Sequence, residues 1–357
     1  MRRAVHVVPL ALMCAAASAG RVAAQTLAGR LLDEATSAPV AAAFATLLDQ
    51  SGATAGAALS AADGRFSINA PAGLYTLRVE RLGFTSYESE PFRLDGDSAS
   101  VRDFRMQARA VVLQALDVAV APRCDAPHEL AAGAVALWEE ARKALAVASW
   151  TALSDRIVYH VTHYKRTFDV GMRLTQEDSQ SVTVRAPRGP FASIPVDSLL
   201  SRGFVQPAPE GRGWLYFGPD PDVLLSDAFL EHYCFRAAPN SLEKDMVGLD
   251  FEPVGPEEVP GIEGTLWLDR DTFELRSIEY SFTRIPYRVA KPAGGRIEFE
   301  ALPDGGWIID YWSMRVPVLR DPGRVPIRSV TLEGYIETVR QLTGAFRSDG
   351  SEIRLGR

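Results

Sequence analysis

Side chains that could carry out acid–base or metal chemistry are few and widely spaced in this sequence. Beyond the N-terminal segment the histidines are His128, His160, His163 and His232. His160 and His163 lie three residues apart in a stretch that alternates like a strand, so they point to opposite faces and cannot share a metal ion. The motifs H-E-x-x-H, G-x-S-x-G, the P-loop and G-x-G-x-x-G are absent. We therefore expect no catalytic residue, no metal site and no cofactor, and predict that the protein is not an enzyme.

Two pairs of acidic residues resemble cation-binding loops at first sight. Asp269 and Asp271 lie in D-R-D-T-F-E, and Asp220 and Asp222 flank a proline. Aspartate is equally the residue that tight turns favour, because its carboxylate accepts hydrogen bonds from nearby backbone N–H groups. We interpret both pairs as turns. A hydrolase that uses His160 or His232 with nearby carboxylates remains an alternative.

Aromatic residues form the other group with binding chemistry. Exposed aromatic side chains stack on sugars or line grooves for acyl chains, whereas strand alternation would bury about half of them in a core. The candidate ligand-contact residues are Trp214, Tyr216, Trp267, Trp307 and Trp312.

The N-terminus indicates export. Two arginines precede an uncharged run interrupted by Pro9, and Val22-Ala23-Ala24 fits the small-x-small cleavage rule, so we predict a signal peptide over residues 1–24. No later window is apolar enough for a transmembrane helix. In an exported chain the two remaining cysteines, Cys124 and Cys234, predict a disulfide. We expect a periplasmic or outer-membrane location.

Composition excludes several other classes. Hydrophobic residues make up 47% and charged residues 23% of the 357 residues, as in folded soluble proteins. The net charge is −7 and no basic block is present, which argues against nucleic-acid binding. This length allows about two domains.

Short alternating runs separated by turn residues fill residues 26–107. The turn Asp63-Gly64 directly precedes one such run, and Asp-Gly is strong hairpin chemistry because glycine adopts positive φ. Regularly spaced strands without a helical pattern predict a seven-strand antiparallel β-sandwich. The runs are 27–32, 44–48, 65–69, 74–80, 84–87, 92–94 and 101–106.

The same residues resemble a known family. The order G-x-L (29–31), D-G-R-F-S-I (63–68), P-A-G-L-Y-T-L-R-V (71–79) and L-G-F (82–84) is similar to the carboxypeptidase regulatory-like domain. The resemblance implies a transthyretin-like, carbohydrate-binding-like sandwich in an extracytoplasmic setting. It implies no peptidase activity, because the family is an accessory module of metallocarboxypeptidases.

A second domain is expected over residues 124–340, after a linker or strand at 108–123. Helical spacing predicts an amphipathic helix over 126–148, with Glu139-Glu140 and Arg142-Lys143 on its solvent side. Long alternating runs then predict a curved antiparallel sheet, so that the chain is mainly β with an α+β second domain. The run G-T-L-W-L-D-R-D-T-F-E-L is weakly similar to periplasmic lipoprotein carriers. Residues 341–357 are expected to form a tail.

These observations favour a non-enzymatic, exported binding or adaptor protein, with carbohydrate contact through the sandwich implied by the family resemblance. A lipid- or lipoprotein-cradling carrier and a hydrolase with an unrecognised site are the alternatives. The partner would be a glycan, a lipid or another envelope protein. The sequence does not determine the oligomeric state.

Overall fold

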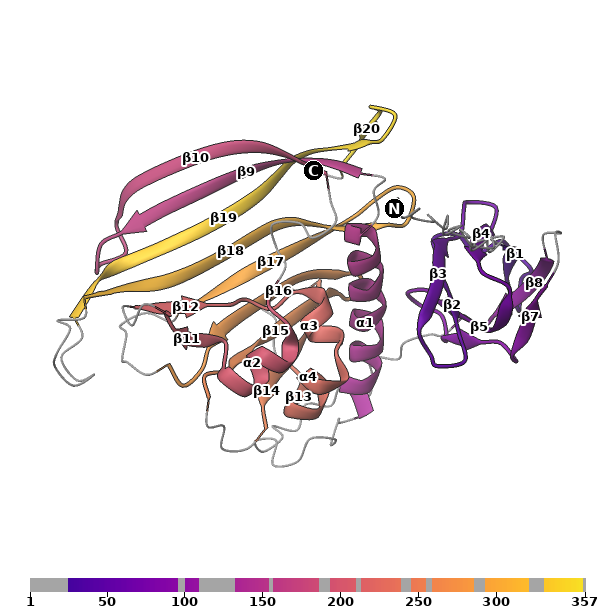
Figure 1. The fold of residues 1–357 in the computed structure, drawn as a ribbon, viewed down its shortest axis with the longest axis horizontal. Helices are drawn as coiled ribbons and strands as arrows, with labels where there is room; N and C mark the ends of the chain where they lie inside the picture. Colours follow the sequence, from indigo (N-terminus) through magenta and orange to yellow (C-terminus); the bar gives the residue numbers. More distant parts are fainter. Residues whose placement is uncertain are drawn as a thin grey trace, which may run out of the picture.

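The computed structural model describes a mainly β protein with an N-terminal sandwich and a larger second domain (Figure 1). This confirms the fold class predicted from strand periodicity. The structure describes residues 25–95, 100–108, 132–153, 157–185, 193–209, 213–238, 245–254, 259–285, 293–320 and 331–355. The expected signal peptide and most of the expected linker lie outside these residues.

The sandwich consists of two sheets with the orders β4-β1-β8 and β3-β2-β5-β6, with β7 paired to β5. It differs from the expectation in two respects. The strand β3 lies at residues 54–59, where no run was predicted. In addition, β1 and β8 run parallel, because the last strand of the module returns beside the first in the same direction. The strands are β1 (Gln25–Asp33), β2 (Phe44–Leu48), β3 (Thr54–Leu59), β4 (Arg65–Ala70), β5 (Gly73–Glu80), β6 (Tyr87–Glu88), β7 (Phe92–Leu94) and β8 (Ser100–Met106).

Strand alternation creates the sandwich core. In β4 exposed and buried residues alternate strictly, which places Phe66, Ile68 and Ala70 inside. The preceding turn needs its glycine: Gly64 has φ +77°, and a Cβ there would lie 2.4 Å from the carbonyl oxygen of Leu31. The Asp-Gly turn therefore fixes the register between two strands of the core.

The second domain is a ten-stranded antiparallel sheet with four described helices. The strand order is β10-β9-β19-β18-β17-β16-β15-β14-β13, and β20 pairs with β19. The strands are β9 (Ile157–Phe168), β10 (Leu174–Arg185), β13 (Tyr233–Ala237), β14 (Met246–Pro253), β15 (Ile262–Asp269), β16 (Leu275–Phe282), β17 (Gly294–Ala301), β18 (Trp307–Arg320), β19 (Thr331–Arg347) and β20 (Glu352–Ile353). A small separate sheet pairs β11 (Val205–Pro207) with β12 (Trp214–Tyr216).

The last long strand, β19, lies between β18 and β9. It therefore pairs with the first strand of the second domain as well as with the strand that precedes it in the chain. It continues through the boundary expected at residue 340 and ends at Arg347. Leu342 and Ala345 are buried and pack in a small cluster with Ile353 of β20. Residues 341–355 therefore belong to the sheet, because apolar burial continues where we expected a tail.

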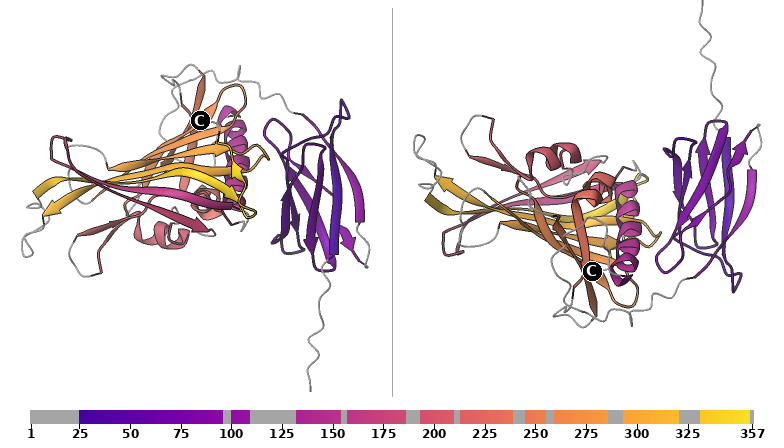
Figure 2. Two further views of the ribbon diagram at one scale, coloured as in Figure 1. Left: turned by 90° about the horizontal axis from the view of Figure 1, so that it is seen from above. Right: turned by 90° about the horizontal axis from the view of Figure 1, so that it is seen from below.

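All four helices lie on one face of the sheet (Figures 1 and 2). The long helix is described from Ala132 to Leu153 and so continues past the end expected at residue 148, while residues 126–131 lie outside the described residues. Its residues Leu137, Trp138 and Leu145 are buried in the main core. The short helices are α2 (Val196–Arg202), α3 (Pro221–Leu225) and α4 (Asp227–His232). We call the opposite side of the sheet the outer face.

The long helix, α1 (Ala132–Leu153), also holds the sandwich. Phe44 of β2 belongs to the same hydrophobic core as α1, and its ring lies 5.5 Å from that of Trp150. Arg142 of α1 pairs with Glu80 of β5 at 2.5 Å. Figure 1 shows the β3-β2-β5 sheet of the sandwich turned toward this helix.

Charged residues of α1 that we expected on the solvent side are buried in this contact. Glu140 is 1% and Lys143 4% exposed, and they pair with each other at 2.7 Å. Lys143 also donates to the carbonyl oxygen of Phe84, and Glu140 accepts from the N–H of Gly83. The helical pattern identified the apolar side correctly, but the sandwich covers part of the polar side.

In the part of the chain that the structure describes, no helix has the length and apolar character needed to cross a membrane.

Candidate functional site

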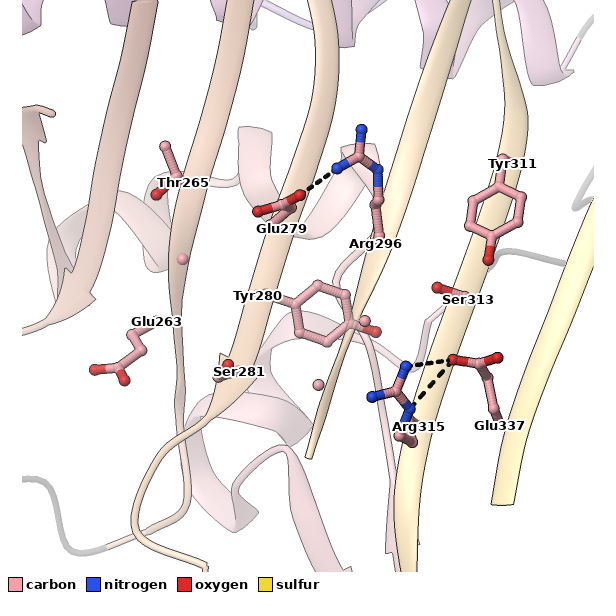
Figure 3. A pocket seen from close by; sticks show the side chains of 13 residues that line it. Glu263, Thr265, Glu279, Tyr280, Ser281, Arg296, Tyr311, Ser313, Arg315 and Glu337 are labelled. Atoms are coloured by element: carbon pink, nitrogen blue, oxygen red, sulfur yellow. Dashed lines mark hydrogen bonds and ion pairs between the residues drawn. The ribbon is translucent and has the colours of Figure 1, made fainter. Parts of the chain in front are cut away.

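A groove of about 590 Å³ lies on the outer face, where no described helix packs (Figure 3). It crosses the five consecutive strands β15 to β19. We call it the sheet groove, and it is lined by Glu263, Gly264, Thr265, Glu279, Tyr280, Ser281, Gly294, Gly295, Arg296, Tyr311, Ser313, Arg315 and Glu337.

Alternation explains why these residues lie together. On β16 and β17 the residues Ile278 and Ile297 point into the core beneath the helices, so their neighbours Glu279 and Arg296 point to the outer face. The antiparallel register then pairs Ser281 with Gly294, Gly294 with Arg315, and Arg315 with Glu337 in one row. The groove is the polar half of a sheet whose other half forms the core.

Glycines open the floor of the groove and let neighbouring strands approach closely. A Cβ on Gly294 would lie 2.1 Å from the carbonyl oxygen of Tyr280, and a Cβ on Gly295 would lie 2.1 Å from that of Ser313. Neither distance is sterically allowed for a side chain. The glycines of β17 are therefore required by the backbone geometry. Gly294 lies on the outer face, where the missing side chain leaves the hollow, whereas Gly295 faces the hydroxyl of Tyr280 on the core side.

Ion pairs hold the charged walls in place. Arg296 bonds to Glu279 on the adjacent strand and to Glu298 on its own strand, the latter at 2.6 Å. Burial alone would lower the pKa of Arg296, but hydrogen bonding and attraction to Glu298 and Glu279 outweigh it and raise the pKa. The guanidinium is thus a fixed cation on the wall of the groove.

A second network closes the other side. Arg315 donates two hydrogen bonds to one oxygen of Glu337, at 2.8 and 3.2 Å. The other oxygen of Glu337 accepts from Arg166 of β9 at 3.5 Å, and Arg166 pairs in turn with Glu177 of β10 at 2.6 Å. This chain of charges extends the polar surface to the edge of the sheet.

Other groups in the groove have no described partner. The carboxylate of Glu263 is exposed and forms no described ion pair, and the hydroxyls of Ser281 and Ser313 make no described hydrogen bond. Figure 3 shows the ring of Tyr311 beside Ser313 at the wall of the groove. The groove therefore presents fixed charges alternating with free donors and acceptors. Such a surface can bind a polar ligand through many hydrogen bonds.

The aromatic residues proposed for ligand contact do not gather at one site. Trp307 and Trp312 are 5% and 8% exposed and belong to the main core, because alternation turned both toward the helices. Trp214 and Tyr216 are half-buried on β12 and pack against that core. Trp267 is half-exposed and lies on the outer face, in register with Ser277.

The described histidines lie apart from one another. His160 and His163 are on β9, with exposed His160 against the ring of Phe346 and His163 paired in register with Arg340. Burial, and then the positive charge of Arg340, lower the pKa of His163. His232 ends α4 and contacts the carbonyl oxygen of Ala228. None of these three makes a described hydrogen bond to a carboxylate.

The pair Asp269 and Asp271 forms a turn, as predicted, whereas Asp220 and Asp222 lie at the start of helix α3 rather than in a turn. Asp269 accepts hydrogen bonds from the N–H groups of Asp271 and Thr272, which lower its pKa. Asp220 caps α3 through the N–H of Val223 and also accepts from Ser193, while burial raises its pKa. Within the described ranges no group of three or more His, Cys, Asp or Glu residues is arranged to hold a metal ion.

Cys234 lies on β13 and is buried. Cys124 is outside the described residues, so the Cys124–Cys234 disulfide stays a prediction.

The sheet groove was not predicted from the sequence. Arg296 lies on the outer face because charged and apolar residues alternate along β17. Arg315 and Glu337 could not be recognised as its neighbours, since that requires the pairing of β18 with β19. The available signal was the alternation of charged with apolar residues on adjacent strands.

The sandwich is similar to a known protein family. Residues 26–107 match the carboxypeptidase regulatory-like domain family. The resemblance predicted from the motifs is confirmed over the same residues, and we refer to them as the regulatory-like domain. No curated protein matches the chain.

Solved structures show only distant similarity. A cohesin–X-dockerin complex from Acetivibrio cellulolyticus is 18% identical over 33% of this chain and 72% of that one, with a TM-score of 0.20. A membrane-associated protein of unknown function from Bacteroides fragilis is 13% identical over 90% of this chain and 96% of that one, with a TM-score of 0.17. The major pilin subunit BcpA of Bacillus cereus is 9% identical over 93% of each chain, with a TM-score of 0.20. Similarities this weak carry no conclusion about fold or function.

Proposed function

We propose that the protein is a non-enzymatic binding or adaptor protein and that the sheet groove is its ligand site. One observation carries the proposal. The groove is a preformed hollow of about 590 Å³ on a face without described helices, and fixed charges and free polar groups from five strands line it. Concave sites with a few convergent polar groups are the usual places for ligands.

The lining favours a hydroxyl-rich ligand such as a glycan. Glu263, Glu279 and Glu337 supply acceptors and Arg296 and Arg315 supply donors, so the charges nearly balance. A sugar presents hydroxyl groups that donate and accept at once, which suits such an alternating surface. Tyr311 in the groove and Trp267 on the same face offer flat surfaces for stacking. In this proposal the glycan site lies in the second domain, and the regulatory-like domain supports it.

The alternatives have less support. A lipid cradle requires an apolar hollow, whereas the helix-covered face carries a packed core that includes Trp307 and Trp312. A hydrolase requires a base beside a nucleophile or a bound water, and the described histidines lie apart from the groove.

We also propose an exported protein at the periplasm or outer-membrane surface. The basis is the N-terminal segment with its cleavage pattern after Ala24. Mass spectrometry of the protein purified from periplasm would test it: the expected mass begins at Gln25 and is two hydrogens below the reduced value because of the Cys124–Cys234 bridge. A mass that retains residues 1–24 would contradict export with cleavage.

The binding proposal is tested with a glycan array and the full mature protein. Ser281→Trp fills the groove from the outer face, so glycan binding should fall about tenfold or more. The matched control is Ser179→Trp on exposed β10, which lies on the same face away from the groove and should bind like wild type.

Four outcomes would overturn the proposal in different ways. Equal binding by both variants would move the site elsewhere, including to the regulatory-like domain. Capture of lipid with no glycan bound would favour the carrier, and turnover of the bound glycan would make the protein an enzyme. If wild type binds nothing, the groove is not a ligand site.

A further inference from the structure

A second cavity lies between the regulatory-like domain and the second domain. It measures about 220 Å³, enough for on the order of seven waters. The regulatory-like domain contributes Ala42, the end of β5 and the residues after it. The second domain contributes α1, the turn before β16 and the hairpin between β17 and β18. Charged and aromatic residues of the lining are Glu80, Arg81, Lys143, Glu274 and Trp307.

Arg81 lacks a partner in this cavity. Its Nε is buried and donates no described hydrogen bond, and its guanidinium forms no ion pair with a described residue. The ring of Phe84 lies 5.7 Å from the guanidinium carbon and offers only a weak cation–π contact. Burial lowers the pKa of Arg81, and the negative charge of Glu274 offsets only part of this lowering.

The neighbouring charges are already paired. Glu80 is bound to Arg142 at 2.5 Å, and Lys143 to Glu140 at 2.7 Å. Glu274 pairs with Arg276 at 2.8 Å. Arg81 is thus the one cation in the described lining without an ion-pair partner. A buried donor without an acceptor costs stability, so a residue in this state is poised to gain from a ligand.

We propose that Arg81 binds a small oxyanion, a carboxylate or a phosphate, in the cavity between the two domains. The planar guanidinium matches the paired oxygens of either group. Trp307, which is 5% exposed, and Val147 of α1 form apolar walls beside it. Because the lining belongs to both domains, the bound anion would stabilise their contact.

Thermal unfolding of the full mature chain tests this site. Sodium acetate and sodium phosphate are titrated against sodium chloride at equal ionic strength, and the rise in Tm gives the affinity by linkage. We expect Tm to rise with at least one oxyanion and not with chloride, and the comparison tells carboxylate from phosphate. Arg81→Gln should weaken that anion roughly tenfold or more, because the charged donor is lost.

Two controls keep the result specific. Arg65→Gln removes an exposed arginine of the regulatory-like domain and should retain the full response. Without anion, Arg81→Gln should be at least as stable as wild type, since it removes a desolvated, unpaired charge. The proposal is overturned if Arg81→Gln responds like wild type, if neither oxyanion raises the Tm of wild type, or if Arg81→Gln is destabilised in anion-free buffer. Ser281→Trp should leave the response intact, so failure here is distinct from failure at the sheet groove.

Discussion

Tyr280 carries its hydroxyl into the main core, where no described group accepts its hydrogen bond. The side chain is 4% exposed, and burial raises the pKa of the phenol. The ring itself packs well, edge-on to Phe282 at 5.7 Å. Burying a hydroxyl without a partner costs free energy that the packing of the ring must outweigh.

Tyr280→Phe should therefore stabilise the protein. The expected gain in the free energy of unfolding is about 1–3 kcal/mol, because the ring stays and only the unsatisfied oxygen is removed. Urea unfolding followed by circular dichroism measures it. The control is Tyr75→Phe, which removes a 2.9 Å hydrogen bond to the carbonyl oxygen of Pro71 and should cost about 0.5–1.5 kcal/mol. A loss of stability in Tyr280→Phe would mean that the hydroxyl has an acceptor.

Residue types alone predicted the surroundings of some side chains and missed those of others. Asp269 was recognisable as a turn residue because its hydrogen-bonding partners lie two and three positions along the chain. Glu140 and Lys143 were not recognisable as buried, since the groups that cover them come from residues 83 and 84. Hydrogen bonds between residues close in the chain can be predicted from the sequence, whereas burial by a distant segment cannot.

At the scale of elements, β17 gives the sheet groove its shape. Its first two residues, Gly294 and Gly295, pair with Tyr280 and Ser281 on one side and with Met314 and Arg315 on the other. Alternation on β15 to β17 is visible in the sequence, and so the core face was predictable. The groove also needs β18 beside β19, a pairing set by tertiary contacts between strands separated by a connection outside the described residues.

Gly295→Ala should destabilise the sheet. The new methyl would lie 2.1 Å from the carbonyl oxygen of Ser313 and 2.6 Å from the hydroxyl of Tyr280, so the strands must separate. Overpacking of this kind costs about 1–3 kcal/mol. The control Gly171→Ala lies in the β9–β10 turn, where the nearest atom would be 3.3 Å away, and should change stability little. Equal urea midpoints for the two variants would contradict this account of the strand geometry.

The turn between β15 and β16 should show a distinct pH dependence. Hydrogen bonds from Thr272, together with Arg276, hold the pKa of Asp269 below its usual value. Its ionised form therefore stabilises the folded state above the unfolded pKa of about 4, and this contribution is lost as pH falls through the lower folded pKa. Asp269→Asn should lower Tm near pH 7 and lose most of that difference by roughly pH 2.

Asp271→Asn is the matched control, because the carboxylate of Asp271 accepts no described hydrogen bond although the residue lies in the same turn. Its Tm should follow wild type at every pH. A constant difference between Asp269→Asn and wild type across the range would show that charge is not the cause.

At the scale of the whole molecule, the two domains share one core. Phe44 of the regulatory-like domain packs with α1, and Glu80 and Arg142 pair beneath the same contact. The hairpin between β17 and β18 adds a close approach, because a Cβ on Gly305 would lie 2.2 Å from that of Ala42. Domains joined by a buried, charged and apolar contact should unfold as one cooperative unit.

Tryptophan fluorescence can test this coupling, because all six tryptophans lie between residues 138 and 312, outside the regulatory-like domain. Leu77→Ala removes a fully buried side chain from the core of that domain and should cost about 2–5 kcal/mol. If the domains unfold together, the fluorescence transition of the second domain shifts by the same amount as the transition seen by circular dichroism. An unshifted fluorescence transition would mean that the domains unfold independently.

Lys143→Met tests whether the buried Lys143–Glu140 pair couples the unfolding of the two domains. The substitution leaves the carboxylate of Glu140 buried without its cation and the carbonyl oxygen of Phe84 without its donor. Breaking such a pair costs about 3–5 kcal/mol, whereas Glu140→Gln with Lys143→Met removes both charges and should recover much of the loss. If the pair is the coupling element, Leu77→Ala in the Lys143→Met background shifts the circular-dichroism transition and leaves the fluorescence transition in place. If both transitions still move together, the apolar contact of Phe44 with α1 is sufficient for coupling, and the buried charges serve instead to fix the orientation of the regulatory-like domain on the helix.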